Sequence, residues 1–456
     1  MAIKVVAVIA VVAIVAAVVI IAIPKGGDPE YNPTPVASPL LVRGNADENY
    51  VIDSNDMKVV EDVIAKKKTL DDYPFADVNN DGKVDDTDKT ILKNMIDRKD
   101  GTTIYIQALG VDGKETTVQV KYPLRDVVTY ASNMEMATNY AGGGEYVAGY
   151  FTKSYKNAEA SVAATAVDLK GSARQISDEA WANFTSLDAT LTAQGRSIGA
   201  LLVDFSGIAQ MTEARVQDLA DAGIPLIIYK PADSLSETSA VVTLSYLFGQ
   251  KTEKTGQEYA KLWDKVTGYL QQKLGNMADA DKNTYISFNM YIYICQNDST
   301  FNSTPATAYG LPYYKTNAEF AEKYKGASSS KMTSTEALAN YTDADKLINN
   351  RSIDWVADEA AAKAMIVETW EHSNSGTPST EFFKGFDDKL YYVNNLLPGP
   401  VKLAYIAACL YDAITIEWAD GIFNDAVNIG LLPIQGQTPT TTLTCFDYDD
   451  YQKAKA

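Results

Sequence analysis

The sequence predicts an α/β protein in which two lobes are joined by a long rigid helix, preceded by a small all-α domain and an N-terminal transmembrane helix. Three features support this: a strand–helix–strand pattern in the middle of the chain, a long amphipathic segment after it, and a duplicated Asp/Asn-rich loop with a helix near the N-terminus. The expected boundaries are residues 1–24 for a transmembrane anchor or signal peptide, 25–43 for a Pro/Gly linker, 44–100 for the small domain, 101–250 for the first lobe, 251–280 for the connecting helix and 281–456 for the second lobe.

The strand–helix–strand pattern begins with the apolar run Ala200–Phe205, which is typical of a buried strand. Thr212 is a suitable N-cap for the next helix, and Gly223 stands where a helix-ending glycine belongs. A second apolar strand follows at Pro225–Tyr229, so the two strands are expected to be parallel. Ligands of such sheets collect at the carboxyl ends of the strands. In this chain those ends are Asp204–Ile208 and Lys230–Asp233.

A long amphipathic helix is expected next. Ser234–Glu237 has the pattern of a capping box and should start one helix, and a longer helix should run from beyond Gly256. About 20 residues at 1.5 Å each would span about 30 Å, enough to join two lobes as a rigid connector. Its apolar face consists of Tyr259, Leu262, Trp263, Val266, Tyr269, Leu270 and Leu274.

The other segments complete the two lobes. Alternating residues on either side of Asp112–Gly113 predict a hairpin, and the segment after Tyr122 predicts a strand, a helix, a Gly-rich turn and a strand. Ala131–Asn133 follows the first strand of this segment, at its carboxyl end. The second lobe should begin near Lys282, with strands at residues 284–289, 346–350 and 390–393 and an apolar helix at residues 400–410.

The N-terminal run Val5–Pro24 is almost entirely Ala, Val and Ile and is long enough to span about 30 Å of hydrocarbon. A cleaved signal peptide is the competing interpretation, although its apolar region is normally about 7–15 residues long. We interpret the run as a single-pass anchor in the cell membrane, with the bulk of the chain extracytoplasmic. Pro24–Pro39 is then an extended tether.

Two copies of a loop–helix pattern lie in residues 45–96, because Asn45–Asp56 aligns with Asp77–Asp88. Oxygen-bearing residues recur at alternate positions, the spacing with which a loop surrounds one calcium ion. Gly82 supplies the sharp turn in the second copy, whereas Tyr50 stands there in the first and is expected to be strained. A chance Asx-rich turn is the alternative. The predicted ligands are Asp77, Asn79, Asp81, the Lys83 carbonyl, Asp85 and Asp88, and Asn45, Asp47, Asn49, the Val51 carbonyl, Asp53 and Asp56.

Composition excludes several classes of function. The net charge of −19 argues against nucleic-acid binding, since phosphates would be repelled. The single histidine, His372, leaves no His-based site for a transition metal and no Cys/His pair for catalysis. The three cysteines Cys295, Cys409 and Cys445 allow at most one disulfide. We therefore expect a protein that is not an enzyme.

The order of these elements resembles class III solute-binding proteins, the helical-backbone receptors of ABC importers. The resemblance covers roughly Tyr122–Ala454 and is carried by the segments DFSGIAQMTEARVQDLADAGIPLIIYKPADSLSET and LYYVNNLLPGPVKLAYIAACLY. It implies capture of a ferric siderophore, haem or cobalamin, and among these we favour an iron complex, with a corrinoid close behind. It also implies delivery to an ABC transporter permease, with Glu213 and Glu336 as candidate docking residues. A carboxylate favoured at a helix N-terminus is the alternative explanation of both.

Aromatic and cationic side chains are plentiful at the predicted strand ends. Flat aromatic faces suit a large ligand, and Arg or Lys pairs with anionic groups on a chelate. The alternative is that about half of these side chains pack in the core. The candidate ligand-binding residues are Phe205, Tyr229, Lys230, Tyr291, Tyr293, Tyr313, Tyr314, Arg351 and Trp355.

The duplicated loop–helix resembles a type I dockerin module, which binds Ca²⁺ and docks on cohesins. The resemblance places cohesin contacts at Ser54, Asn55, Asp86 and Thr87. A calcium-stiffened spacer is the simpler role on a receptor. The second hypothesis for the whole chain is a calcium-dependent surface-assembly or adhesion protein that acts through this module on a cohesin-like partner.

Overall fold

A computed structural model describes most of the globular part of the chain. The described residues are 40–152, 165–172, 175–231, 234–289, 293–295, 311–312, 329–331, 344–371, 385–432 and 436–456. The predicted N-terminal anchor or signal peptide lies outside them. No helix in these ranges is both long and apolar enough to cross a bilayer.

The first lobe is built on a seven-stranded sheet with the order β2-β1-β7-β6-β3-β4-β5. Strands β3 to β7 are mutually parallel where they pair, and the hairpin β1–β2 adds an antiparallel edge. The parallel strand–helix–strand unit predicted from residue 200 onward is confirmed. The bounds are β1 Thr103–Leu109, β2 Glu115–Lys121, β3 Val127–Tyr130, β4 Val147–Tyr150, β5 Val167–Asp168, β6 Leu201–Asp204 and β7 Leu226–Tyr229.

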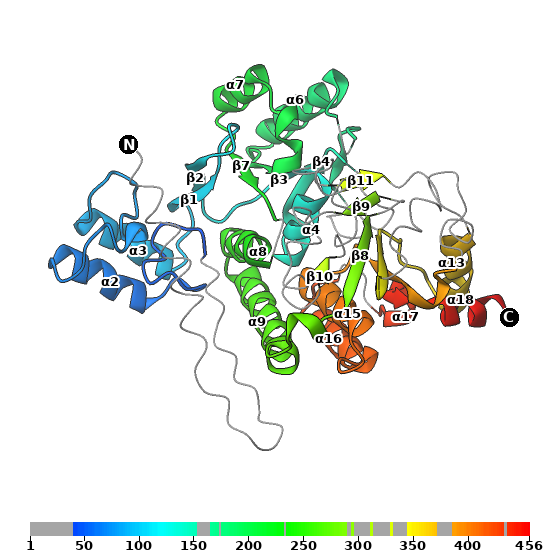
Figure 1. Ribbon diagram of the computed structural model, residues 1–456. Coiled ribbons are helices and arrows are strands. Elements are labelled where there is room, and N and C mark those ends of the chain that lie inside the picture. Colours follow the sequence, from blue (N-terminus) through cyan, green and yellow to red (C-terminus); the bar gives the residue numbers. More distant parts are fainter. Residues whose placement is uncertain are drawn as a thin grey trace. The chain divides into compact units, whose positions relative to one another are not determined.

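Helices cover both faces of this sheet (Figure 1). Alternation along β6 explains the layering, because Leu201 and Val203 pack against one set of helices and Leu202 against the other. Thr212 caps α7 through its side chain and Gly223 ends it at φ 68°, as predicted. One face carries α6 (Asp178–Ala193) and α7 (Glu213–Ala222), and the other carries α4 (Ser132–Tyr140) and α8 (Ser234–Phe248).

The second lobe has its own sheet, with the order β11-β9-β8-β12-β13-β14 and β10 paired to β8. The described strands therefore form two separate sheets, as the two-lobed α/β prediction requires. Helices α13 (Glu359–Glu371) and α18 (Tyr448–Lys455) cover one face, and α15 (Gly399–Leu410) and α16 (Ile416–Asn428) the other. The bounds are β8 Thr284–Asn289, β9 Tyr293–Cys295, β10 Leu311–Pro312, β11 Ser329–Lys331, β12 Lys346–Arg351, β13 Leu390–Asn394 and β14 Cys445–Phe446, with the short helix α17 at Pro439–Thr442.

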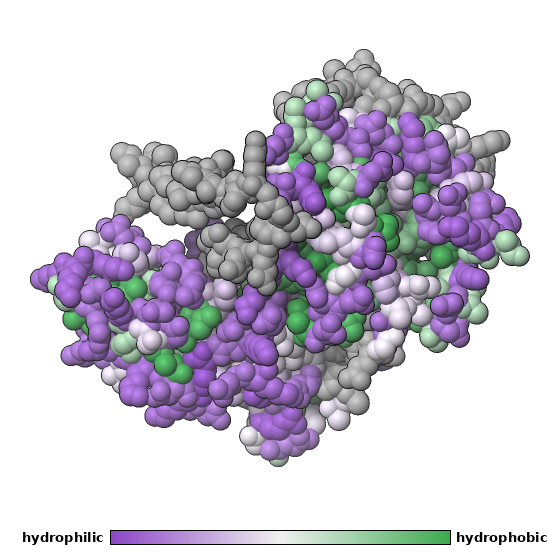
Figure 2. All heavy atoms as spheres, turned by 90° about the horizontal axis from the view of Figure 1, so that it is seen from below, coloured by the Kyte–Doolittle hydropathy of each residue, from purple (hydrophilic) through white to green (hydrophobic). Residues whose placement is uncertain are grey.

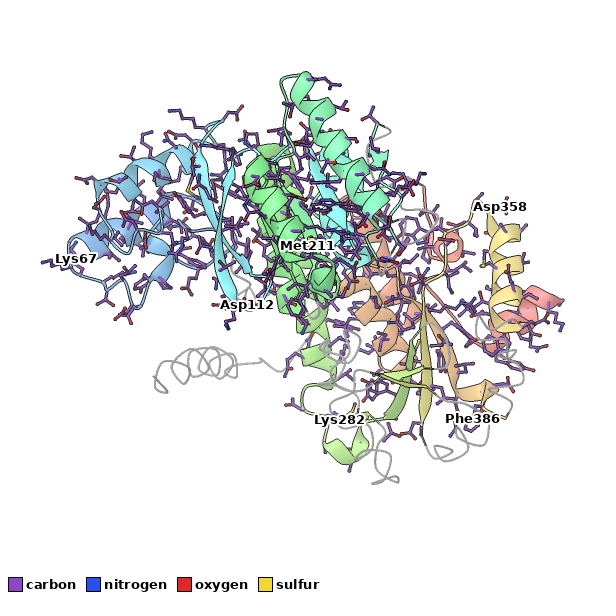
Figure 3. The ribbon with its side chains drawn as sticks, turned by 90° about the horizontal axis from the view of Figure 1, so that it is seen from above. Lys67, Asp112, Met211, Lys282, Asp358 and Phe386 are labelled. Atoms are coloured by element: carbon purple, nitrogen blue, oxygen red, sulfur yellow. The ribbon has the colours of Figure 1, made fainter. Side chains whose placement is uncertain are left out.

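The connecting helix α9 (Gln250–Leu274) is continuous over 25 residues, or about 37 Å. Its start at Gln250 agrees with the expected bounds of 251–280. The expectation that the helix would run only from beyond Gly256 is wrong, since Gly256 lies inside it. A Cβ at that position would overlap the Ser245 Oγ of α8, so the glycine serves close helix packing. Helix α9 also packs on the second lobe, where Tyr269 stacks on Trp418 with ring centres 4.3 Å apart. Figure 3 marks Lys282, which lies between α9 and β8.

The small N-terminal domain contains the two predicted helices, α2 (Ser54–Ile64) and α3 (Asp86–Ile96), which lie against each other (Figure 1). Each begins with a capping box. The prediction that the backbone is strained at Tyr50 is wrong, since Tyr50 does not have a positive φ. The left-handed residues that the two loops share are Glu48 at φ 56° and Asn80 at φ 59°, one position before the alternate-position ligands Asn49 and Asp81.

This domain is packed on the first lobe. The Arg98 guanidinium reaches the start of α9, where its Nε donates to Glu253 Oε2 at 2.9 Å, and it lies over the Tyr246 ring. The Leu41 amide donates to the Thr243 Oγ1 of α8 at 2.9 Å. Side chains of the domain and of the first lobe belong to one hydrophobic core. On the face of the molecule drawn in Figure 2, most of the described surface residues are hydrophilic. A hydrophilic surface is expected for a chain with a net charge of −19.

Candidate functional site

The carboxyl ends of the parallel strands define the candidate site in each lobe. In the first lobe, β3, β4, β6 and β7 run in the same direction, so their last residues share one edge of the sheet. In the second lobe, β8, β12 and β13 do the same. Ligands of parallel sheets bind at such edges because loops and helix N-termini converge there.

Two of the predicted first-lobe residues come together at this edge. The Lys230 Nζ lies 5.7 Å from the centre of the Phe205 ring, and Lys230 is exposed. Phe205 is half-buried, because the turn of the β1–β2 hairpin at Gly113 lies against its ring. Figure 3 labels Asp112 at this turn. Tyr229 is only 4% exposed and packs in the core, so it is not on the surface with the other two.

The described part of the second lobe includes two predicted residues with their side chains. Arg351 ends β12, is half-buried, and donates from Nη1 to the Thr369 carbonyl at 3.3 Å. Trp355 is buried, and within the described ranges its Nε1 has no hydrogen-bond partner. Tyr293 starts β9, and only its backbone is described. Tyr291, Tyr313 and Tyr314 lie outside the described residues.

A buried carboxyl that was not among the predicted site residues lies beside the first-lobe edge. Glu135 is in the first turn of α4, is 2% exposed, and its Oε1 has no hydrogen-bond partner in the part of the chain that the structure describes. Burial raises the pKa of the Glu135 carboxyl to about 8. Burial raises the pKa of the Tyr150 phenol, and the negative charges of Asp168 and Glu135 raise it further. The signal in the sequence was its place one turn beyond Ala131–Asn133, which was expected at this edge.

Unpaired hydroxyls accompany this carboxyl. Thr129 on β3 pairs in register with Tyr150 on β4, and Thr152 follows two residues after the end of β4. The hydroxyls of both threonines are buried and have no hydrogen-bond partner among the described residues, which leave out 153–164. Buried polar groups normally have partners, and groups that lack one often mark sites where a ligand or water supplies it.

Glu135→Gln should flatten the dependence of stability on pH. With a folded pKa of about 8, against an ordinary value of 4.5, the folded chain keeps this proton where the unfolded chain has lost it. The free energy of unfolding should therefore fall as the pH rises through that window. Glutamine, which is neutral throughout, should remove this contribution.

Denaturant titrations at several pH values measure this slope. Glu213→Gln is the matched control, because Glu213 is also in the first turn of a helix but is exposed. The control should keep the wild-type slope. Equal slopes in wild type and Glu135→Gln would contradict the effect of burial.

A polar network lies where the second-lobe strands end. Asn395 Oδ1 accepts hydrogen bonds from Asn350 Nδ2 at 3.1 Å and from Lys402 Nζ at 3.0 Å. Burial lowers the pKa of Lys402, and the charge of Glu237 on α8 opposes that shift. Glu237 lies so close to the first residue of α15 that a Cβ at Gly399 would overlap its Oε2. A carboxylate is favoured at a helix N-terminus, so Glu237 links the two lobes electrostatically.

In both loops, carboxylate oxygens of predicted calcium ligands accept hydrogen bonds from backbone amides of the same loop. Asp88 accepts from the Val78 and Asp85 amides at 2.8 Å each, and Asp77 accepts from the Gly82 amide at 2.9 Å. Burial raises the pKa of Asp88, and in the first loop it raises the pKa of Asp56 to about 7. The Oδ1 of Asn45 is buried and has no hydrogen-bond partner from residue 40 onward in the described chain. In the part of the chain that the structure describes, no three His, Cys, Asp or Glu side chains form a ready metal-binding group.

Of the two candidate docking residues, Glu213 and Glu336, only Glu213 lies in the described part of the chain. Glu213 is the first residue of α7 and is exposed. Its position also suits a carboxylate that stabilises the N-terminus of its own helix. Glu336 lies outside the described residues.

The chain matches no protein-family model and no curated protein. Among solved structures it is similar to the TroA-like periplasmic binding protein FepB from Veillonella parvula, with 14% identity and a TM-score of 0.46 over 70% of this chain and 95% of that chain. It is also similar to the triscatecholate siderophore binding protein FeuA from Bacillus subtilis, with 16% identity and a TM-score of 0.43 over 70% and 98% of the two chains. It is similar as well to the molybdate periplasmic binding protein MolA from Haemophilus influenzae, with 10% identity and a TM-score of 0.46 over 72% of this chain and 97% of that chain. Values at this level are too low to carry an argument about the ligand or the function of this chain.

Proposed function

We propose that this chain is an extracytoplasmic solute-binding protein that captures a metal chelate between two lobes and delivers it to the permease of an ABC importer. The observation that carries the proposal is the architecture itself, in which two separate α/β sheets are joined by the continuous helix α9. Side chains of α9 pack with both lobes, so the helix is stiffened along its length. A receptor of this type needs two lobes held at a stable separation.

The proposed ligand is a ferric siderophore or a similar iron complex, with a corrinoid as the alternative. An anionic chelate suits the exposed Lys230 and the half-buried Arg351, each at the carboxyl end of a parallel strand. Phe205 beside Lys230 offers an aromatic edge for the organic part of the ligand. The role is binding rather than catalysis.

Delivery requires that the protein stays near its permease. We assign the predicted N-terminal anchor to that task and Glu213 to the docking contact. The exposure of Glu213 supports the second assignment.

The small N-terminal domain is proposed to bind Ca²⁺ in both loops. A hard cation such as Ca²⁺ prefers oxygen ligands, and both loops supply them at alternate positions. The buried Asn45 Oδ1, which has no hydrogen-bond partner among the described residues, is available as one of these ligands. Bound calcium would supply charge that offsets the mutual repulsion of the carboxylates. Cohesin-type docking through this domain is the second candidate function, and it is favoured by the exposure of Ser54, Asn55, Asp86 and Thr87.

Ligand titration followed by tryptophan fluorescence tests the receptor proposal. Ferric siderophores, haem and cobalamin are added in turn, and one of them is expected to change the emission, since Trp355 follows closely after Arg351. Arg351→Ala should weaken that binding by roughly tenfold or more, which corresponds to about 1.4 kcal/mol. No response to any of the three classes would argue against the proposal.

Arg196→Ala is the control for the titration. Arg196 pairs with Asp126, and these residues precede β6 and β3, at the amino ends of the first-lobe strands, whereas Arg351 ends a strand of the second-lobe sheet. Removing this guanidinium should leave chelate binding unchanged. Equal losses in the two variants would indicate a general charge effect instead of a site.

A further inference from the structure

Two of the three cysteines lie side by side in the second lobe. The Sγ atoms of Cys409 and Cys445 are 3.2 Å apart, although the residues are 36 positions apart in the sequence. Cys409 is 3% exposed in the last turn of α15, and Cys445 is half-buried at the start of β14. Both are free thiols in the structure.

Regular secondary structure holds both positions. Cys445 pairs in register with Val393 on the neighbouring strand β13, and the Asn394 amide donates to the Thr444 carbonyl at 3.0 Å. Helix α15 packs on the same strand. The two sulfurs therefore meet because a helix and an edge strand are both anchored to β13, and only a small movement separates their contact from the S–S bond length of about 2.05 Å.

We propose that Cys409 and Cys445 form a reversible disulfide when the protein meets a disulfide-bearing oxidant. One thiolate attacks a sulfur of the oxidant and gives a mixed disulfide, and the second thiolate then displaces the oxidant's sulfur. Two S–H bonds are lost and one S–S bond forms. The two electrons and two protons end on the oxidant, which is reduced to two thiols. An extracytoplasmic location would supply such oxidants.

The bond would fasten the C-terminal edge of the second lobe to α15. The closed loop contains α16 and α17, and α15 begins at Gly399 beside Glu237 of the first lobe. Oxidation would thus stabilise the helix through which the second lobe meets α8. Contact with Cys409, together with burial, raises the pKa of Cys445, so oxidation should be slow at neutral pH and faster in more alkaline solution.

Mass spectrometry of the full chain tests the proposal. A Cys295→Ser background removes the third thiol, and the protein is incubated with oxidised glutathione, unfolded without reductant and treated with an alkylating agent. The expected product is about 2 Da lighter than the reduced chain, resists alkylation, and yields one peptide pair that joins residues 409 and 445. Alkylation of both thiols, or glutathione adducts without an internal link, would overturn the proposal.

Cys409→Ser in the same background is the control, because a single thiol can form only a mixed disulfide. Thermal unfolding gives a second readout that needs no new variant. The oxidised form should unfold several degrees above the reduced form, since a cross-link restricts the unfolded chain. Equal unfolding temperatures of the two forms would overturn the stabilising role.

Discussion

Calcium should raise the unfolding temperature of the wild-type protein, and Asp88→Ala should remove one of two bound calcium ions. Asp88 is fully buried and occupies the last ligand position of the second loop, where it also caps α3. A ligand that binds only the folded state adds about 2.7 kcal/mol when it is present at a hundred times its Kd. Loss of this carboxylate removes a ligand from the loop and leaves the Val78 and Asp85 amides without their acceptor.

Asp86→Ala is the matched control for this prediction. Asp86 is two residues away, its side chain is 93% exposed, and it lies outside the ligand positions. The control should bind calcium with unchanged stoichiometry in a calorimetric titration, whereas Asp88→Ala should bind one ion fewer. A wild-type chain that takes up no calcium would refute the proposed sites, and equal stoichiometry in wild type and Asp88→Ala would exclude Asp88 as a ligand.

Local signals predicted most of the fold. Thr212 and Gly223 delimit α7 as expected, because a side-chain cap and a left-handed glycine act within one turn of the chain. The apolar runs that became β6 and β7 were identified for the same reason, since burial on both faces demands continuous hydrophobic residues.

Two predictions about the fold were wrong, at Gly256 and at Tyr50. Gly256 has a low helix propensity and suggested a boundary, but its lack of a side chain lets α8 and α9 approach closely within a continuous helix. Tyr50 occupies the glycine position of the first loop without a positive φ, whereas Gly82 in the second loop has φ 85°, and both loops have a left-handed residue two positions earlier, at Glu48 and Asn80. Neither outcome follows from neighbours in the sequence alone.

The candidate site was predicted in part, and for a physical reason. Phe205 and Lys230 each end a strand of one strand–helix–strand unit, so their proximity follows from the order of elements. Glu237 and Lys402 are far apart in the sequence and are coupled through the junction between α8 and α15. Glu135 follows closely after Ala131–Asn133 in the sequence, but its burial, and an Oε1 without a hydrogen-bond partner among the described residues, require a three-dimensional structure.

Gly256→Ala should destabilise the protein, whereas Gly421→Ala should stabilise it. Both glycines lie inside helices, α9 and α16, so both substitutions gain roughly 0.5–1 kcal/mol of helix preference. A Cβ at Gly256, however, would overlap the Ser245 Oγ and lie 3.2 Å from the Val242 Cα. Overpacking of this kind costs about 1–3 kcal/mol, and backbone cannot move as a side chain can. At Gly421 a Cβ would meet nothing within 4 Å.

Denaturant unfolding of the two variants measures these opposite shifts, and the receptor proposal adds a second expectation. Parting α8 from α9 would change how the connector packs on the first lobe, so Gly256→Ala should also weaken chelate binding, while Gly421→Ala should leave it unchanged. If Gly256→Ala is as stable as Gly421→Ala, the inference that a Cβ at residue 256 would be overpacked against Ser245 is wrong. If it is destabilised yet binds the chelate normally, the packing of α9 on α8 does not control the distance between the lobes.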